Sequence, residues 1–197
     1  MQDYIKEYLS QHQKTISGLP HDAIERIIRH FRKALDNGRQ IFMFGNGGSG
    51  TNASHFATDL GKGSSDKTHR RFRCMSLNDN TSWITALGND YSYEDVFLRQ
   101  LINLAQPDDL VFVMSVSGNS PNVVKALEWA KANGVYTIAL VGNKRGRLTG
   151  IADLPLVVED VHYGRVEDAH MTICHIVAYA FMEMDSLQQP VMPTENQ

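Results

Sequence analysis

The chain has 197 residues, of which 42% are hydrophobic and 21% are charged, and its net charge is −3. This length suits one well-packed domain rather than two, and the weak negative charge supplies no field that would hold nucleic acid or an anionic membrane. No apolar run is long enough to span a bilayer, and the first residues lack a signal-peptide pattern. We therefore expect a single domain over residues 1–197 that is cytoplasmic and binds a small molecule.

Two helices are expected before the first strand. Apolar residues recur with helical spacing over residues 3–37, and the pattern breaks at Gly18-Leu19-Pro20. The second helix carries a broad apolar stripe from Ile24 to Phe31. That stripe can belong to the ordinary core, or it can cover a partner subunit.

Strands and helices alternate through the rest of the chain. Strand-like runs lie near residues 40–44, 72–77, 110–114, 136–141 and 154–158. Helix-like segments lie near residues 50–61, 92–105, 120–133, 144–151 and 165–186. This alternation predicts an α/β fold, a doubly wound five-stranded parallel sheet flanked by helices, with its ligand crevice at the carboxyl ends of the strands. The predicted parts are N-terminal helices over 1–37, an α/β core over 38–187 and a flexible tail over 188–197.

A glycine-rich loop follows the first predicted strand. The run Gly45-Asn46-Gly47-Gly48-Ser49-Gly50 lies between that strand and a helix start. Glycines let the backbone turn sharply and expose amide groups at a helix N-terminus, where an anion is favoured. The spacing matches neither the P-loop nor a dinucleotide fingerprint. The loop is therefore either an anion site or only a tight turn.

A second loop has the same arrangement. Ser115-Val116-Ser117-Gly118-Asn119-Ser120 connects a predicted strand to a helix. Three hydroxyls and a row of amides can supply the uncharged donors that a phosphate accepts. The alternative is that the serines only cap the helix and stabilise a turn. Two such loops in one domain favour phosphate, and sugar phosphate is the ligand class that we expect.

Imidazoles and carboxylates lie on two predicted helices. His55 and Asp59 are four residues apart and share a helix face, and Glu167, His170 and His175 lie on the last helix. If the two helices converge, the set suits proton transfer at carbon or a divalent metal such as zinc. A histidine on a mostly apolar helix can also be a core residue, and Glu167 can simply favour the helix dipole.

Several motifs together point to one family. In chain order they are Gly45-Asn46-Gly47-Gly48-Ser49, His55-Phe56-Ala57, Gly88-Asn89-Asp90, Ser115-Val116-Ser117-Gly118-Asn119-Ser120 and the helix from Glu167 to His175. Over residues 3–186 the chain resembles the sugar isomerase (SIS) domain family in its phosphoheptose isomerase branch. The resemblance implies a flavodoxin-like strand order and a homotetramer with shared active sites. It also implies interconversion of sedoheptulose 7-phosphate and D-glycero-D-manno-heptose 7-phosphate through an enediol, for bacterial heptose biosynthesis.

The resemblance also implies roles for individual residues. Those that would hold the phosphate are Ser49, Ser115, Ser117 and Ser120. Those that would line the rest of the substrate are Asn46, Gly47, Gly48, Asn89, Asp90, Val116 and Glu167. Zinc would be bound by His55, Asp59, Glu167 and His175. Asp59 and His175 would also be the catalytic base and acid.

The chain departs from the family pattern at some of these positions. Asp59 stands where the isomerases have glutamate, and Glu167 stands where they have glutamine. Aspartate withdraws the carboxylate by about 1.5 Å, one bond length, whereas a second negative ligand would strengthen metal binding. These changes leave two alternatives to the isomerase: an isomerase or sensor for another phosphosugar, and a non-enzymatic SIS-domain protein of the replication-initiator-binding type.

Overall fold

The fold is built on one parallel sheet. The computed structural model describes residues 1–189, so the predicted tail lies outside the described residues from residue 190 on. The strands are β1 (Gln40–Gly45), β2 (Arg73–Ser76), β3 (Leu110–Ser115), β4 (Tyr136–Gly142) and β5 (Leu154–Val158). They pair in the order β2-β1-β3-β4-β5, and every pair is parallel. This confirms the predicted doubly wound five-stranded sheet and its flavodoxin-like order.

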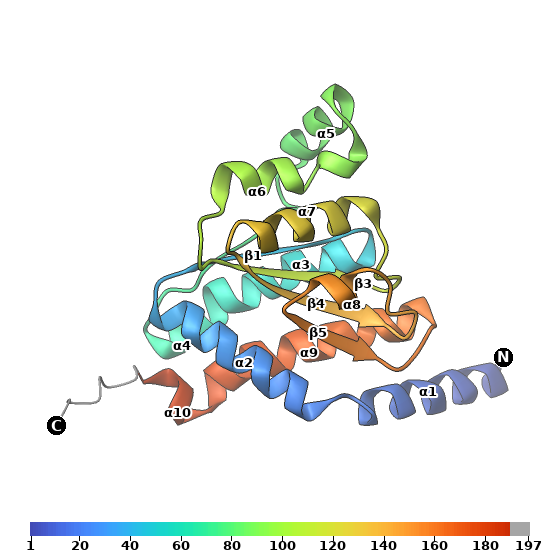
Figure 1. Ribbon diagram of the computed structural model, residues 1–197. Coiled ribbons are helices and arrows are strands. Elements are labelled where there is room, and N and C mark those ends of the chain that lie inside the picture. Colours follow the sequence, from blue (N-terminus) through green and yellow to red (C-terminus); the bar gives the residue numbers. More distant parts are fainter. Residues whose placement is uncertain (190–197) are drawn as a thin grey trace.

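Helices cover both faces of the sheet (Figure 1). On one face lie α2 (His21–Asp36), α3 (Gly48–Thr58), the π-helical turn η1 (Asp59–Ser64), α4 (Ser65–Thr68), α9 (Tyr163–Glu183) and α10 (Asp185–Gln188). On the other lie α5 (Thr81–Asp90), the 3₁₀ turn η2 (Tyr93–Asp95), α6 (Leu98–Leu104), α7 (Pro121–Ala132) and α8 (Leu148–Ile151). Helix α1 (Gln2–Ser17) extends beyond the sheet and touches α9.

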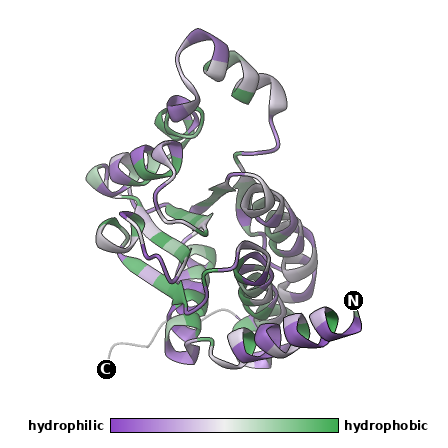
Figure 2. Ribbon diagram, turned by 90° about the vertical axis from the view of Figure 1, so that its right-hand side faces the viewer, coloured by the Kyte–Doolittle hydropathy of each residue, from purple (hydrophilic) through white to green (hydrophobic). Residues whose placement is uncertain are grey.

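The apolar strands explain why both faces need a cover. Along β1, Ile41 and Met43 belong to the core beneath α2, α3 and α9, whereas Phe42 and Phe44 belong to the core beneath α6 and α7. Successive side chains of a strand point to opposite faces, so a continuous apolar run is buried only between two helix layers. Figure 2 shows this as hydrophobic colour on the strands between the layers.

The N-terminal helices differ in how they are packed. The stripe of α2 is core, because Ile27 and Phe31 are fully buried, so it does not form a surface for a partner. On α1 no residue is buried, and Tyr4, Ile5 and Leu9 are exposed. The uncovered apolar surface therefore lies one helix earlier than the sequence pattern suggested.

The sequence pattern did not predict the short helix α4 or the longer helix α5. Helix α5 begins after Asn80, whose side-chain oxygen accepts a hydrogen bond from the amide of Trp83 at 3.0 Å. Its serine, threonine and glycine residues are weak helix formers, which hid it. Within residues 1–189, no helix combines the length and the apolar character that crossing a bilayer requires.

Candidate active site

Both glycine- and serine-rich loops leave the same edge of the sheet. Gly45 at the end of β1 is in register with Met114 of β3, one residue before the serine loop. The strands β1 and β3 are neighbours, and the winding direction reverses between them. Ligands of doubly wound sheets bind at this point, beyond the carboxyl ends of the strands.

The first loop needs glycine at several positions. Gly47 has φ +55° and ψ −127°, a conformation that side chains disfavour, and it ends the loop at the start of α3. Asn78, which follows β2, binds both polar groups of the Gly45 backbone. Its side chain donates to the Gly45 carbonyl at 2.9 Å and accepts from the Gly45 amide at 3.3 Å. The first amides of α3, at Gly48 and Ser49, have no acceptor within the helix and suit an anion.

Asn46 is tied to the second loop. Its side chain and that of Asn122 exchange two hydrogen bonds, each 2.9 Å long. Asn122 lies in the first turn of α7 and is almost fully buried. The hydroxyl of Tyr93, from η2, donates to the Asn46 carboxamide oxygen at 3.1 Å. Segments that are far apart in sequence therefore meet at Asn46.

The serines of the second loop do not all act alike. Ser120 precedes α7 without a side-chain capping bond, and its oxygen lies 3.5 Å from that of Ser115. Ser117 stabilises the turn by accepting the amide of Asn119 at 3.3 Å. The side chain of Val116 is buried in the core, and its carbonyl accepts the Gly142 amide, so Val116 can offer a ligand only its main-chain N–H. Capping therefore does not account for Ser115 and Ser120.

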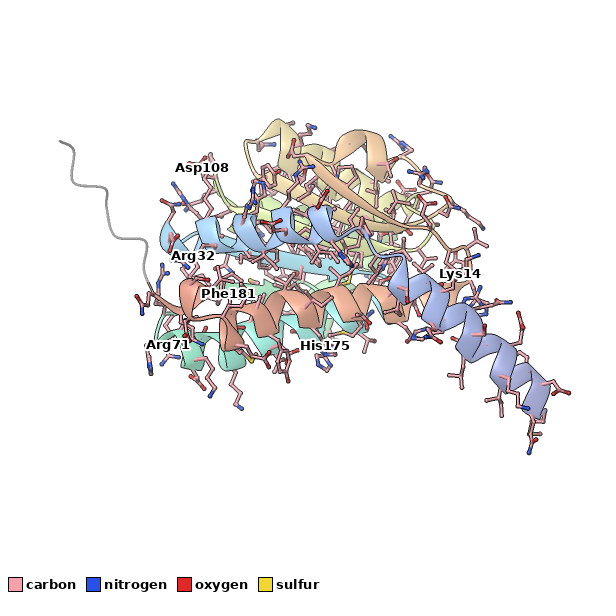
Figure 3. All side chains as sticks on the ribbon, turned by 90° about the horizontal axis from the view of Figure 1, so that it is seen from below. Lys14, Arg32, Arg71, Asp108, His175 and Phe181 are labelled. Carbon is pink, nitrogen blue, oxygen red and sulfur yellow. The ribbon has the colours of Figure 1, made fainter. Side chains whose placement is uncertain are left out.

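A second cluster lies at the other end of α3. His55, Asp59 and His175 place one potential ligand atom each within 4.8 Å of one another. Asp59 Oδ2 lies 3.4 Å from His55 Nε2 and 3.7 Å from His175 Nε2, and the two imidazole nitrogens are 3.4 Å apart. Figure 3 shows His175 projecting outward from α9. The two helices therefore converge, which is the condition that the sequence left open.

Asp59 reaches both imidazoles although it is shorter than glutamate. It is the first residue of the π-helical turn η1, where the helix is wider than at α3. Its Oδ2 atom is buried and has no hydrogen-bond partner among the described residues. A buried carboxylate oxygen facing two imidazole nitrogens is a donor set that fits a divalent cation such as zinc.

Glu167 does not join this cluster. It lies eight residues before His175 on α9, which separates their backbones by about 12 Å along the axis. A Cβ added to Gly48 would lie 2.5 Å from Glu167 Oε2, so the carboxylate rests against the glycine loop. Burial, and then the charge of Asp168, raise the pKa of Glu167. The structure thus brings three of the four expected metal ligands together and places the fourth beside the expected phosphate site.

Three other residues that the sequence singled out make no hydrogen bond, among the described residues, to either loop or to the His–Asp cluster. Asn89 and Asp90 are exposed at the end of α5, where the Asn89 amide donates to the Asp90 carboxylate at 2.9 Å. His170 is fully buried in the core, and burial lowers its pKa to about 4. It is turned about 140° from His175 around α9, so the two histidines cannot share a site.

Three residues that shape the site carry little signal in the sequence. Asn122 follows Pro121 and resembles an ordinary residue of a helix start, and Asn78 matters only because β2 pairs with β1. Tyr93 carries no local signal at all. Each contributes through a contact between segments that are distant in sequence.

Comparison with known proteins places the chain in a family. The SIS domain matches residues 3–142. The probable phosphoheptose isomerase of Thermoplasma acidophilum is 38% identical over 172 residues, which cover 87% of this chain and 94% of that protein. The phosphoheptose isomerase of Geotalea daltonii is 37% identical over 180 residues, covering 90% and 93%.

Solved structures agree with these relatives. A phosphoheptose isomerase from Francisella tularensis superposes with a TM-score of 0.84 and 28% identity, covering 92% of this chain and 97% of that one. The enzyme from Neisseria gonorrhoeae gives a TM-score of 0.84 and 25% identity, covering 91% and 97%. The chain therefore belongs to the SIS domain family, and within it to the phosphoheptose isomerases.

Proposed function

We propose that the chain is an aldose–ketose isomerase that interconverts sedoheptulose 7-phosphate and D-glycero-D-manno-heptose 7-phosphate in heptose biosynthesis. The names of its relatives and structural neighbours support this function. The observation that carries it is the placement of two different sites on one helix. The N-terminus of α3 lies in the glycine loop, and its far end carries His55 and leads into Asp59.

The separation of these sites suits the substrate. Gly48 and His55 are seven residues apart on α3, which corresponds to about 10 Å along the axis. A seven-carbon chain with bonds of about 1.5 Å spans a comparable length when extended. A phosphate at C7 held by the loops, with Ser49, Ser115, Ser117 and Ser120 as donors, would therefore leave C1 and C2 near the His–Asp cluster.

The cluster can perform the proton transfers of the reaction. Asp59 takes the proton from C1 of the ketose, and the electron pair of that C–H bond forms the C1–C2 double bond of the enediol. Asp59 then gives a proton to C2, while the imidazole of His175 moves the hydroxyl proton between O1 and O2. The proton held by Asp59 can exchange with solvent before it is returned, so in deuterated water the carbon next to the carbonyl group gains deuterium. C1 is oxidised to the same extent as C2 is reduced, so there is no net redox change and the reaction needs no external electron acceptor.

Zinc is the metal that this donor set suits best. His55, Asp59 and His175 would hold the ion. Glu167, which lies on α9 with its carboxylate beside Gly48, would contact the substrate rather than the ion. A bound divalent ion supplies Lewis-acid polarisation of a sugar oxygen. Asp59 could still move a proton through its second carboxylate oxygen, whereas His175 could do so through Nε2 only while that atom does not coordinate the ion.

The assembly that we propose is a homotetramer with shared active sites. Asn89 and Asp90 are exposed on α5 and make no hydrogen bond to either loop among the described residues, although the family resemblance puts them against the sugar. The exposed apolar residues of α1 provide a surface that a second copy would cover. Such packing would let one subunit complete the site of another.

Hydrogen exchange at carbon tests the isomerase directly. Sedoheptulose 7-phosphate is incubated with the protein in deuterated water and followed by NMR, with protein as isolated, after chelation and after zinc is restored. We expect deuterium next to the carbonyl group and formation of the aldose. Loss of both on chelation and recovery with zinc would support the metal site.

The same experiment separates the alternatives. Exchange with another ketose phosphate but not with the heptulose would redirect the proposal to a different phosphosugar. Tight binding without exchange would indicate a sensor. No exchange and no binding of any sugar phosphate would favour the non-enzymatic role, with capture of the replication initiator as the next measurement.

A further inference from the structure

The pairing of Asn46 with Asn122 links the two loops of the candidate site. The carboxamides exchange two hydrogen bonds of 2.9 Å, and Asn122 is only 2% exposed. Asn46 precedes α3 and Asn122 belongs to α7, so the pair connects the two loops on which phosphate binding would depend.

The orientation of both carboxamides follows from one unambiguous donor. The main-chain amide of Val123 can only donate, and it lies 3.0 Å from Asn122 Oδ1. This fixes Oδ1 of Asn122 as the acceptor, so Asn46 must present its Nδ2 to that atom and its Oδ1 to Asn122 Nδ2. The amide of Val123 therefore sets the orientation of Asn46.

Tyr93 completes the arrangement. Its hydroxyl donates to Asn46 Oδ1 at 3.1 Å, so this oxygen receives two hydrogen bonds and its lone pairs are used. The turn that carries Tyr93 is fixed to α7, because Asp95 accepts from Lys125 at 2.8 Å and from Ser92 at 2.9 Å. Only N–H groups of the pair remain available to a ligand.

We propose that Asn122 and Tyr93 are positioning residues that hold the Asn46 carboxamide with an N–H group directed at an oxygen of the sugar phosphate. This rests on the proposed function, because it assigns the orientation of a group at that same site. Freed from Asn122 and Tyr93, the carboxamide could rotate and present its oxygen, which would repel a phosphate or carbonyl oxygen.

A double-mutant cycle tests the coupling. Asn122→Ala, Asn46→Ala and the combined variant are compared in kcat and KM for sedoheptulose 7-phosphate. Alone, Asn122→Ala is expected to lower kcat/KM at least about tenfold, the order expected when a hydrogen-bonded group loses its partner. In the Asn46→Ala background it is expected to have almost no further effect, since Asn122 acts through Asn46.

Matched variants separate orientation from charge and folding. Asn122→Asp keeps the size of the side chain and the acceptor for the Val123 amide, but it can no longer donate to Asn46. Asn119→Asp adds the same charge to the same loop without touching Asn46, and measures the effect of charge alone. Tyr93→Phe removes one hydroxyl and is expected to lower kcat/KM by a smaller factor than Asn122→Ala. It should lower kcat/KM only when Asn46 is present.

The outcomes distinguish this proposal from the proposed function. If Asn122→Ala lowers kcat/KM by the same factor with and without Asn46, the role of Asn122 is structural and the proposal is wrong. If Asn122→Asp loses no more than Asn119→Asp, orientation of Asn46 is likewise excluded. If the wild-type protein has no turnover, the isomerase fails, and the cycle is measured in the Kd of the sugar phosphate by calorimetry, where the same non-additivity is expected.

Discussion

A single carboxylate oxygen lies close to both imidazoles of the candidate site. Asp59 Oδ2 is buried, lacks a hydrogen-bond partner among the described residues and lies within 3.7 Å of both His55 and His175. These distances show that an aspartate at the start of the π-helical turn is long enough to come close to both imidazoles. Reach, rather than side-chain length, decides whether the base can act.

Replacing this carboxylate measures its role. Asp59→Asn keeps the side-chain size but removes the base, so kcat for sedoheptulose 7-phosphate is expected to fall at least about a hundredfold, the usual contribution of general base catalysis. Asp59→Glu keeps a carboxylate and is expected to retain more activity than Asp59→Asn. Steady-state kinetics and deuterium exchange are the measurements. Equal rates for Asp59→Asn and the wild type would exclude Asp59 as the base.

Glu167 can be tested as a neighbour of the substrate phosphate. Its carboxylate lies against Gly48 at the start of α3, where it would repel a bound phosphate. Glu167→Gln is therefore expected to lower KM severalfold and to leave zinc affinity unchanged. Kinetics and a zinc titration with a chelating dye check both. Weaker zinc binding in this variant would restore Glu167 as a metal ligand.

The same substitution has a pH-dependent effect on stability. Burial raises the pKa of Glu167 in the folded state, so its charged form opposes folding once the pH exceeds the ordinary glutamate pKa of about 4.3. Glu167→Gln is expected to raise the free energy of unfolding at pH 7, and the gain should vanish below about pH 4. Urea titrations at several pH values measure it, and a pH-independent gain would contradict this origin.

At the scale of elements, a network of polar groups fixes α1 to the start of α9. Asp160 accepts two hydrogen bonds from Arg165, at 2.6 and 3.0 Å, and one from Thr15 of α1 at 2.6 Å. The rings of Tyr8 and His162 also meet edge to face, with centroids 5.5 Å apart. These contacts orient a helix that has no buried residue of its own.

Asp160→Asn is expected to lower the melting temperature by at least about 3 °C at pH 7. Hydrogen bonds from Arg165, together with those from Thr15 and the His162 amide, hold the pKa of Asp160 far below its usual range. The stabilisation is therefore full above the ordinary aspartate pKa of about 3.9 and is lost as the pH falls toward the folded-state pKa. Thermal melts from pH 7 to pH 3 should show the two proteins converging.

An exposed ion pair supplies the control. Asp108 pairs with Arg39 at 3.1 Å, and its side chain is 75% exposed. Its backbone is left-handed, with φ +70°, which asparagine adopts readily. Asp108→Asn should change the melting temperature little, because exposed ion pairs contribute little. An equal decrease in melting temperature for Asp160→Asn and Asp108→Asn would exclude a special role for the Asp160 network.

At the scale of the whole molecule, α1 extends from the body with an apolar surface that no other part of residues 1–189 covers. Tyr4, Ile5 and Leu9 are 69%, 48% and 59% exposed. Burying such side chains is favourable by roughly 1.5–3 kcal/mol each. A second copy of the chain is the occupant that the proposed homotetramer requires.

The double variant Ile5→Asp/Leu9→Asp is expected to reduce the mass measured by light scattering during gel filtration. Charges at these positions would have to be buried in the interface, and an unpaired buried charge is costly. Ser10→Asp/Gln13→Asp adds the same charge at polar exposed positions of α1 and should leave the mass unchanged. A tetramer that persists in the first variant would show that α1 is not part of its interface.

The sequence alone determined the elements whose signal is local. Apolar runs of four to six residues marked the strands, and the glycine and serine loops marked where a phosphate could bind, because strand, turn and helix start follow one another along the chain. Helical spacing put His55 and Asp59 on one face. Helix α5 was not predicted, because its residues are weak helix formers and only Asn80 signals its start.

Only the tertiary structure decided which of these parts meet. Pairing of β1 with β3 set the two loops side by side, and packing of α3 against α9 joined His175 to Asp59 while burying His170. The Glu167 carboxylate lies beside Gly48, and Asn122 and Tyr93 contact Asn46 from segments that are distant in sequence. The reason is physical: helical and strand periodicity follow from neighbours along the chain, whereas a site is formed by contacts that exist only after the sheet has set its strand order.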